Sequence, residues 1–293
     1  GKGGDGGTCI AEGSDWTQFL ESRVVGLKDR PDGWNKLLVQ TLDRCLVEVC
    51  NQPNGAFRAL TQWSDGCKVT RLTDAQGLVG HLGKSEAKSA LKSPRDALWF
   101  SCLCMGSPKA QNGKEASGPE TREKYPGHWS RFRTLWNAFE YVASHAIARG
   151  CMVFIEWPRG CAEWRDEKVV RFLAKHGFVF VDFDGCMYDY VAHNGERADR
   201  RMKSPSRIAC VNSSLRRLLC AKCDGKHRHA PHAEQGEMGG QGYSPMVAQL
   251  IHTAIKADVY AYEEYVAKGP QSAACVSIAC PLDALDDDSV LHV

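Results

Sequence analysis

The sequence predicts an α/β fold, with one three-layer domain in which helices cover both faces of a doubly wound, mostly parallel sheet. Short β-type runs alternate with helical stretches along most of the chain, and no internal repeat is present. This alternation favours parallel pairing, because each helical crossover returns the chain to the same end of the sheet. With 293 residues, of which 43% are hydrophobic, the chain is long enough to fill one large core.

The expected strands are rich in apolar and β-branched residues and end at turn-forming residues. In chain order, they cover residues 46–50, 67–73, 97–104, 151–156, 178–183 and 207–211. The expected helices cover residues 56–63, 78–91, 131–149, 163–176 and 244–261. The third helix is the clearest, because Phe132, Leu135, Trp136, Phe139 and Val142 recur at helical spacing on one face.

The chain divides into an extension, a domain and a tail. Residues 1–44 begin as a glycine-rich, flexible leader and continue as an amphipathic helical extension. Residues 45–262 are expected to form the α/β domain, which includes a basic segment rich in cysteine and histidine at residues 197–232. Residues 263–293 form an acidic C-terminal tail.

Composition narrows the class of protein. No run of about 18 uncharged apolar residues is present, so we expect no membrane partner. The 14 cysteines are scattered through strands and helices of a large chain, which is typical of reduced thiols inside the cell. We therefore expect an intracellular protein, in the nucleus or the cytoplasm.

Polar groups follow the first two expected strands, at the end of the sheet where doubly wound folds bind ligands. Cys50 and Asn51 lead into a turn that contains Gly55, and Asp74 follows the second strand. A glycine lets the backbone approach a ligand closely, and a carboxylate can accept hydrogen bonds from ribose hydroxyls. These residues are therefore candidates for binding an adenosine-bearing cofactor. The turn contains no G-x-G-x-x-G pattern, so an ordinary β–α turn is the alternative.

The next two strands end in groups with catalytic chemistry. The apolar run at residues 97–103 leads into Cys104 and a lysine-containing loop, a setting that favours a thiolate nucleophile. Glu156 ends the following strand and could act across the same cleft as an acid or a hydrogen-bond partner. Alternatively, Cys104 is a buried core thiol and Glu156 is a surface carboxylate. A thiol hydrolase that pairs Cys104 with His128 is a further alternative.

The order of these motifs resembles that of the DNA cytosine-C5 methyltransferases. In that family a first turn holds the cofactor, a later strand ends in a cysteine loop, and the strand after it ends in a glutamate. The corresponding segments here are Leu103-Cys104 and Glu156-Trp157-Pro158. A closer resemblance, over roughly residues 45–256, is to divergent methyltransferase-like domains of protist mobile-element-type polyproteins. Strings similar to LWFSCLCMGSPKAQNG, FIEWPRGCAEW, FVFVDFDGCMYDY and CDGKHRH carry it.

The resemblance implies a Rossmann-like methyltransferase fold and a mechanism. Cys104 would attack C6 of a flipped-out cytosine, and Glu156 would hold N3 and stabilise the charge there. C5 would then accept the methyl group of S-adenosylmethionine, and a base would remove the C5 proton. Arg207 is the candidate for an arginine that supports the base and the loop in this family.

Two positions depart from the family pattern. Leu103 stands where the family has a proline, and Pro53 lies in the turn where the family has a Phe-x-Gly-x-Gly sequence. Because proline lacks a backbone N–H donor, the turn is altered where the cofactor would bind. The alternative function is therefore a methyltransferase-like module without turnover, which binds nucleic acid or a polyprotein neighbour.

A Cys-x-x-Cys motif followed by histidines forms a second chemical cluster. Two thiolates at this spacing can reach one ion, and histidines a few residues later can complete a tetrahedral zinc site. The alternative is a basic, histidine-rich loop whose thiols are buried in the core. The candidate metal ligands are Cys220, Cys223, His227, His229 and His232.

The same region is strongly basic, with ten Lys or Arg against two acidic residues between positions 197 and 228. Such a segment could neutralise phosphates, so we expect a nucleic-acid partner, with DNA favoured over RNA. A solvated basic face is the alternative. The candidate contact residues are Arg200, Arg201, Lys203, Arg216, Arg217, Lys222, Lys226 and Arg228.

Overall fold

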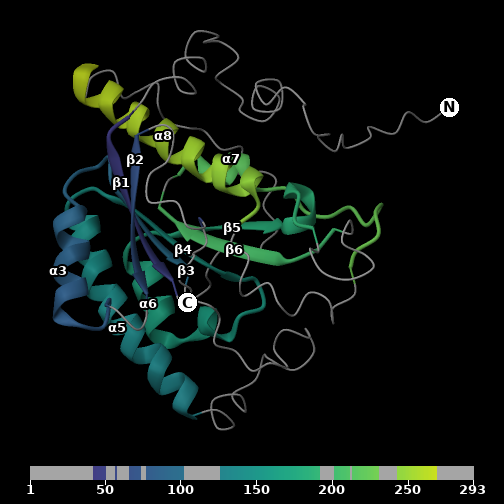
Figure 1. The fold of residues 1–293 in the computed structure, drawn as a ribbon, viewed down its shortest axis with the longest axis horizontal. Helices are drawn as coiled ribbons and strands as arrows, with labels where there is room; N and C mark the ends of the chain where they lie inside the picture. Colours follow the sequence, from purple (N-terminus) through teal and green to yellow (C-terminus); the bar gives the residue numbers. More distant parts are fainter. Residues whose placement is uncertain are drawn as a thin grey trace.

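A computed structural model describes residues 42–50, 57, 66–73, 77–101, 126–191, 201–211, 213–230 and 243–268. These residues form a six-stranded sheet in the order β2-β1-β3-β4-β6-β5, with helices on both faces (Figure 1). The strands are β1 (Arg44–Cys50), β2 (Cys67–Thr73), β3 (Ala97–Ser101), β4 (Met152–Pro158), β5 (Val179–Asp184) and β6 (Pro205–Cys210). The helices are α3 (His81–Ala90), α5 (Pro126–Ala148), α6 (Glu167–Lys175), α7 (Leu215–Leu218) and α8 (Pro245–Lys268), with single 3-10 turns at η2 (Ala162–Arg165) and η3 (Gly185–Tyr188).

The sheet is mostly parallel, as the sequence predicts, but one strand is reversed. β1 pairs in parallel with both β2 and β3, and β3 pairs in parallel with β4. β6 lies between β4 and β5 and runs antiparallel to both. The described part of the connection from β5 to β6 contains the short η3 and no crossover helix. Antiparallel neighbours need no crossover, so this connection agrees with the reversed direction of β6.

The two faces of the sheet carry separate hydrophobic clusters. One cluster packs α3, α5 and α6 against the sheet, and the other packs α7 and α8 against the opposite face (Figure 1). Side chains alternate between the two clusters along β4, where Phe154 belongs to the α8 side and Ile155 to the α5 side. The three-layer arrangement that the sequence predicts is therefore present in the described residues.

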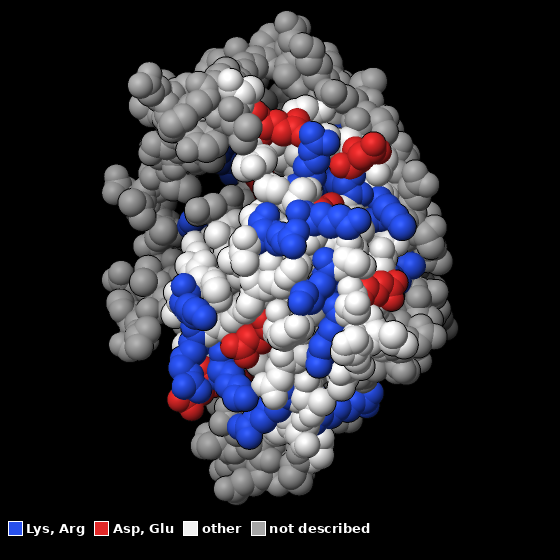
Figure 2. All heavy atoms as spheres, turned by 90° about the vertical axis from the view of Figure 1, so that its left-hand side faces the viewer, with Lys and Arg blue, Asp and Glu red and all other residues white. Residues whose placement is uncertain are grey.

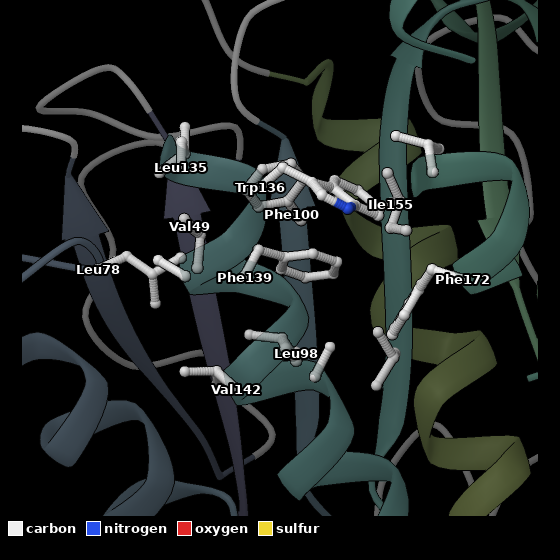
Figure 3. Packing of buried hydrophobic residues seen from close by; sticks show 14 of the residues in the cluster. Val49, Leu78, Leu98, Phe100, Leu135, Trp136, Phe139, Val142, Ile155 and Phe172 are labelled. Carbon is white, nitrogen blue, oxygen red and sulfur yellow. The ribbon is translucent and has the colours of Figure 1, made fainter. Parts of the chain in front are cut away.

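Aromatic rings fill the centre of the α5 side, as Figure 3 shows for Phe100, Trp136 and Phe139. The rings of Phe100 and Phe139 stack with centroids 4.2 Å apart. Trp136 stands edge-on to Phe172 of α6 at 5.6 Å, so the cluster joins β3, α5 and α6. Offset and edge-to-face pairs of this kind add to the stabilisation from area burial.

A buried carboxylate sets the start of β3. Asp96 accepts hydrogen bonds from the backbone N–H groups of Cys45 at 2.9 Å, of Lys92 at 2.9 Å and of Ser93 at 3.0 Å. The Cys45 bond crosses to β1, whereas the other two close the turn after α3. One side chain thus fixes the turn and the position of β3 beside β1.

Several element boundaries differ from the sequence prediction. The helix expected at 163–176 is divided into η2 and α6 at Asp166, whose carboxylate accepts a hydrogen bond from the Lys168 backbone N–H at 3.0 Å. The helix expected at 244–261 extends to Lys268 as α8. The expected extension at 1–44 overlaps β1, which begins at Arg44, and the expected tail at 263–293 begins inside α8. Residues 1–41, residues 269–293 and the expected helix at 56–63, apart from Phe57, lie outside the described residues.

The two longest helices of the described ranges are α5, with 23 residues, and α8, with 24 residues. Each buries apolar side chains against its own face of the sheet. In these ranges, no helix combines the length and the apolar character that crossing a membrane requires.

Replacing Trp136 by alanine should remove the centre of the α5-side cluster. The side chain is 0% exposed, so we expect Trp136→Ala to lower the free energy of unfolding by about 3–5 kcal/mol. Tyr141→Ala, on the same helix but 54% exposed, should change it by less than about 1 kcal/mol. Urea unfolding followed by far-UV circular dichroism measures both, and equal losses for the two variants would contradict the assigned core.

Candidate functional site at the carboxyl edge of the sheet

The strand ends that the sequence singles out lie along one edge of the sheet. Cys50, the last residue of β1, is in register with Thr73 of β2 and with Ser101 of β3. Phe100 of β3 is in register with Ile155 of β4, so Ser101 and Glu156 each lie one residue beyond that pair. The ends of β1, β2 and β3 therefore lie side by side, and Glu156 of β4 lies level with them.

Not every predicted site residue can be placed. The backbone of Cys50 ends β1, at the edge where the sequence predicts a cofactor. Asn51, Gly55, Asp74 and Cys104 lie outside the described residues. The structure describes the chain up to Ser101, three positions before Cys104, beside β4.

Glu156 is held by a relay of hydrogen bonds from the α8 side of the sheet. Its Oε2 accepts a hydrogen bond from the Tyr243 hydroxyl at 3.2 Å. The same hydroxyl accepts a bond from Trp99 Nε1 at 3.0 Å, so Trp99 of β3 orients Tyr243 and Tyr243 orients the carboxyl group. Tyr243 lies two residues before the start of α8 and more than 80 residues after Glu156, so the relay is a tertiary arrangement.

The environment of Glu156 favours its protonated form. Burial raises the pKa of the carboxyl group to about 7, although hydrogen bonds from the Ser206 and Tyr243 hydroxyls act in the opposite direction. Burial also raises the pKa of Tyr190 and of Tyr243, and in both cases the nearby Glu156 adds to the increase. A carboxyl group with such a pKa can donate or accept a proton near neutral pH.

A second buried carboxylate anchors the chain after β1. Glu48 is fully buried and accepts hydrogen bonds from Arg71 Nε at 2.9 Å and from the Phe57 backbone N–H at 3.2 Å. The Phe57 ring packs edge-on against both Trp99 and Tyr243, with centroids 5.4 Å away in each case. Phe57, which follows the predicted cofactor turn, therefore packs against the two aromatic residues that orient Glu156.

Arg207 does not join this site. Its guanidinium donates to Asp182 through Nε at 2.6 Å and Nη2 at 2.9 Å, and it lies 4.5 Å over the Phe180 ring. Phe180 packs with the α5-side cluster, whereas the partners of Glu156 belong to the α8-side cluster. The predicted partner is thus on the opposite face of the sheet, and its neighbour Ser206 is the β6 residue that reaches Glu156.

A cluster of metal-ligating side chains lies beyond the end of β5. Ligand atoms of Cys186, Cys223, His227 and His229 are all within 4.8 Å of one another, a set that could hold a metal ion. Cys220, the first cysteine of the Cys-x-x-Cys motif, is exposed and is not in this set. His232 lies outside the described residues.

Sequence reasoning missed Cys186, Tyr243 and Ser206. Cys186 stands 37 residues before Cys223, so no local spacing connects the two. Tyr243 and Ser206 are separated from Glu156 by a similar or longer stretch and belong to no motif. The one local signal is the Asp184-Gly185-Cys186 sequence at a strand end, which marks a turn without showing what the thiol contacts.

The predicted nucleic-acid contacts differ in exposure. Arg201 is half-buried and donates to the Cys186 carbonyl oxygen at 3.4 Å, and Arg200 lies outside the described residues. The exposed side chains of the segment are Lys203, Lys222, Lys226 and Arg228, and the half-exposed ones are Arg216 and Arg217. Lys226 forms an ion pair with Asp224 at 3.4 Å.

A second basic surface, which the sequence analysis did not predict, covers the helices of the α5 side. Figure 2 shows Lys and Arg outnumbering Asp and Glu on the side of the molecule where α3 and α5 lie. The basic side chains of α3, of α5 and of the turns that follow them are Lys84, Lys88, Lys92, Arg95, Arg131, Arg133 and Arg149. Glu86 and Glu140 are the acidic residues of the same helices.

The chain matches no protein-family model, no curated protein and no solved structure.

The pKa of Glu156 predicts a pH-dependent stability. The folded protein binds this proton more tightly than the unfolded chain between about pH 4.5 and 7, so stability should fall as the pH rises through this window. Glu156→Gln cannot titrate, so its free energy of unfolding should exceed that of the wild type by about 2–3 kcal/mol more at pH 8 than at pH 4.5.

Urea unfolding at several pH values measures this difference. Glu167→Gln is the matched control, because Glu167 is an exposed glutamate on α6. A Glu156→Gln profile parallel to that of the wild type would contradict a raised pKa for Glu156.

Proposed function

We propose that the chain is an S-adenosylmethionine-dependent methyltransferase that acts on cytosine in nucleic acid, DNA rather than RNA. The observation that carries the proposal is the position of Glu156 near the carboxyl end of β4, where the Tyr243 hydroxyl donates to its carboxyl group at 3.2 Å and burial raises its pKa to about 7. It lies beside the end of β3, from which the chain continues to Cys104. A nucleophile and a protonated acid at neighbouring strand ends suit attack on a base whose ring nitrogen must accept a hydrogen bond.

The sheet order supports this reading. Five strands that run in one direction, with a final strand inserted antiparallel next to the edge strand, fit the Rossmann-like methyltransferase fold that the sequence resemblance implies. The ends of β1 and β2 are in register, so an adenosine could span the turn after β1 and Asp74 after β2. Glu48 fixes Phe57 at the end of that turn. This arrangement of the ends of β1 and β2 suits S-adenosylmethionine, which would supply the methyl group.

The residues of the chain would divide the remaining work. Cys104 would attack C6 of the cytosine as a thiolate, and Glu156 would donate a hydrogen bond to N3 in its protonated form. Tyr243, held by Trp99, would orient the Glu156 carboxyl group. After C5 has been methylated, a base would take the C5 proton and the bond to Cys104 would break. Arg207 has no part in this scheme, because it pairs with Asp182 on the other face.

A second candidate function is a nucleic-acid-binding module without turnover. The observation that favours it is Pro53, which removes a backbone donor from the turn after β1, together with the basic side chains around the Cys/His cluster. Under this reading the fold would be retained for binding, and Glu156 would be a half-buried polar group beside the core.

Cofactor binding and methyl transfer separate the two functions. We expect saturable heat on titration with S-adenosylmethionine and incorporation of labelled methyl groups into cytosine-containing DNA. Cys104→Ser should abolish transfer while retaining cofactor binding, and Glu156→Gln should lower kcat by at least about 100-fold. Glu167→Gln should leave both unchanged. Absence of heat and of a thermal shift at millimolar cofactor would reject the methyltransferase.

Paired neutralisations test which basic surface binds DNA. Lys222→Ala with Arg228→Ala removes two exposed charges beside the Cys/His cluster, and Lys92→Ala with Arg149→Ala removes two from the α3 and α5 side. We expect the first pair to reduce the slope of log affinity against log salt by about 2 and the second to leave it unchanged. Fluorescence anisotropy with a labelled duplex at several salt concentrations measures this. The reverse result would move the interface to the α3 and α5 side.

A further inference from the structure

Two separate segments of the chain bring the four possible ligands together. Cys186 lies in η3, immediately after β5, and is buried. Cys223, His227 and His229 come from the segment after α7 and are half-buried. The segment 201–204 lies between them, since Arg201 forms a β-bridge with His229 and donates to the Cys186 carbonyl oxygen.

The spacing of the ligand atoms fits a tetrahedral zinc ion. With Zn–S of about 2.3 Å and Zn–N of about 2.0–2.1 Å, tetrahedral geometry separates a sulfur from a nitrogen ligand by about 3.5 Å. The observed distances from Cys223 Sγ are 3.7 Å to His227 Nε2 and 3.4 Å to His229 Nε2. Both histidines thus present the same ring nitrogen to the same sulfur, at the separation that a shared ion would require.

A backbone donor and a side-chain acceptor support the cluster from outside. The Gly225 backbone N–H donates to Cys223 Sγ at 3.3 Å, in a turn that Gly225 permits through its φ of +75°. The Cys223 backbone N–H donates to Asp184 Oδ2 at 2.9 Å, and Asp184 is itself paired with Arg159 at 3.3 Å. Ligands whose orientation is fixed by such outer contacts lose little freedom when a metal binds.

We propose that the chain binds one zinc ion through Cys186, Cys223, His227 and His229 in a closed, structural site. The donor set of two sulfurs and two nitrogens is one that zinc commonly takes in structural sites. Cys220 has no part in it: its exposed thiol is directed to the Arg217 carbonyl oxygen, 3.8 Å away. The Cys-x-x-Cys motif therefore contributes one ligand, and the second thiolate comes from η3.

The ion would brace one wall of the Glu156 site. Gly185 precedes Cys186, and a β-carbon at Gly185 would overlap the ring of Tyr190. Tyr190 is buried and close enough to Glu156 for the carboxylate to raise the pKa of its hydroxyl. Zinc bound at Cys186 would hold η3, and with it Tyr190, against the start of β6, where the Gly185 backbone N–H donates to the Ser204 carbonyl oxygen at 3.1 Å. This inference does not depend on methyl transfer.

Metal analysis of the purified chain tests the site. Inductively coupled plasma mass spectrometry should find one zinc per chain, and cobalt substitution should give the visible spectrum of a tetrahedral site with two thiolates. Cys186→Ser should lose the metal and Cys220→Ser should retain it. His227→Gln changes a half-buried loop residue, so it should lose affinity by about 10-fold or more in a folded chain. Chelation of the wild type should lower Tm by about 5 °C or more.

Three results would overturn the proposal. One is a chain without zinc that also gives no cobalt spectrum at micromolar cobalt. Another is loss of the metal in Cys220→Ser with retention in Cys186→Ser, which would show that Cys220 and Cys223 of the Cys-x-x-Cys motif are the two thiolate ligands. The third is a disulfide between Cys186 and Cys223 in the non-reduced intact mass, because a disulfide leaves no thiolates for the ion.

Discussion

The reversed strand β6 is the constraint on which the rest of the described structure depends. Because it runs antiparallel between β4 and β5, it carries Ser206 to Glu156 on one face and Arg207 to Asp182 on the other. The connection from β5 must also turn back along the same end of the sheet, which places Cys186 beside the segment that follows α7. Both the carboxyl site and the Cys/His cluster are consequences of one strand direction.

The same end of the sheet contains two carboxyl groups whose electrostatic environments differ. Glu48 and Glu156 are both desolvated carboxyl groups on the α8 face of the sheet. They differ in the charge of their hydrogen-bond partners. Glu48 has a guanidinium partner in Arg71, which compensates its buried charge. Glu156 has only hydroxyl donors among its described contacts, from Ser206 and Tyr243, so burial prevails and raises its pKa to about 7. The packing of this region would not by itself require a carboxyl group at position 156.

Local pattern was sufficient for much of the fold. Helical spacing of apolar residues located α5, and short apolar runs bounded by turns located all six strands, because both signals are confined to a few neighbouring residues. The mostly parallel direction of the strands also followed, since a helical crossover between two strands favours parallel pairing. Their order and register did not follow from the sequence. The direction of β6 did not follow, because a short apolar run looks the same in either direction.

The sequence by itself determined which strands end in polar groups and therefore that Glu156 stands at the carboxyl edge beside the chain leading to Cys104. Only the tertiary structure decided what Glu156 touches, which face Arg207 takes, and that Cys186 rather than Cys220 joins Cys223. The reason is physical: the face of a strand residue depends on register with its neighbours, and a ligand set depends on atoms brought together from distant segments. The spacing of residues that are close in sequence predicts neither the face of a strand residue nor the ligand set.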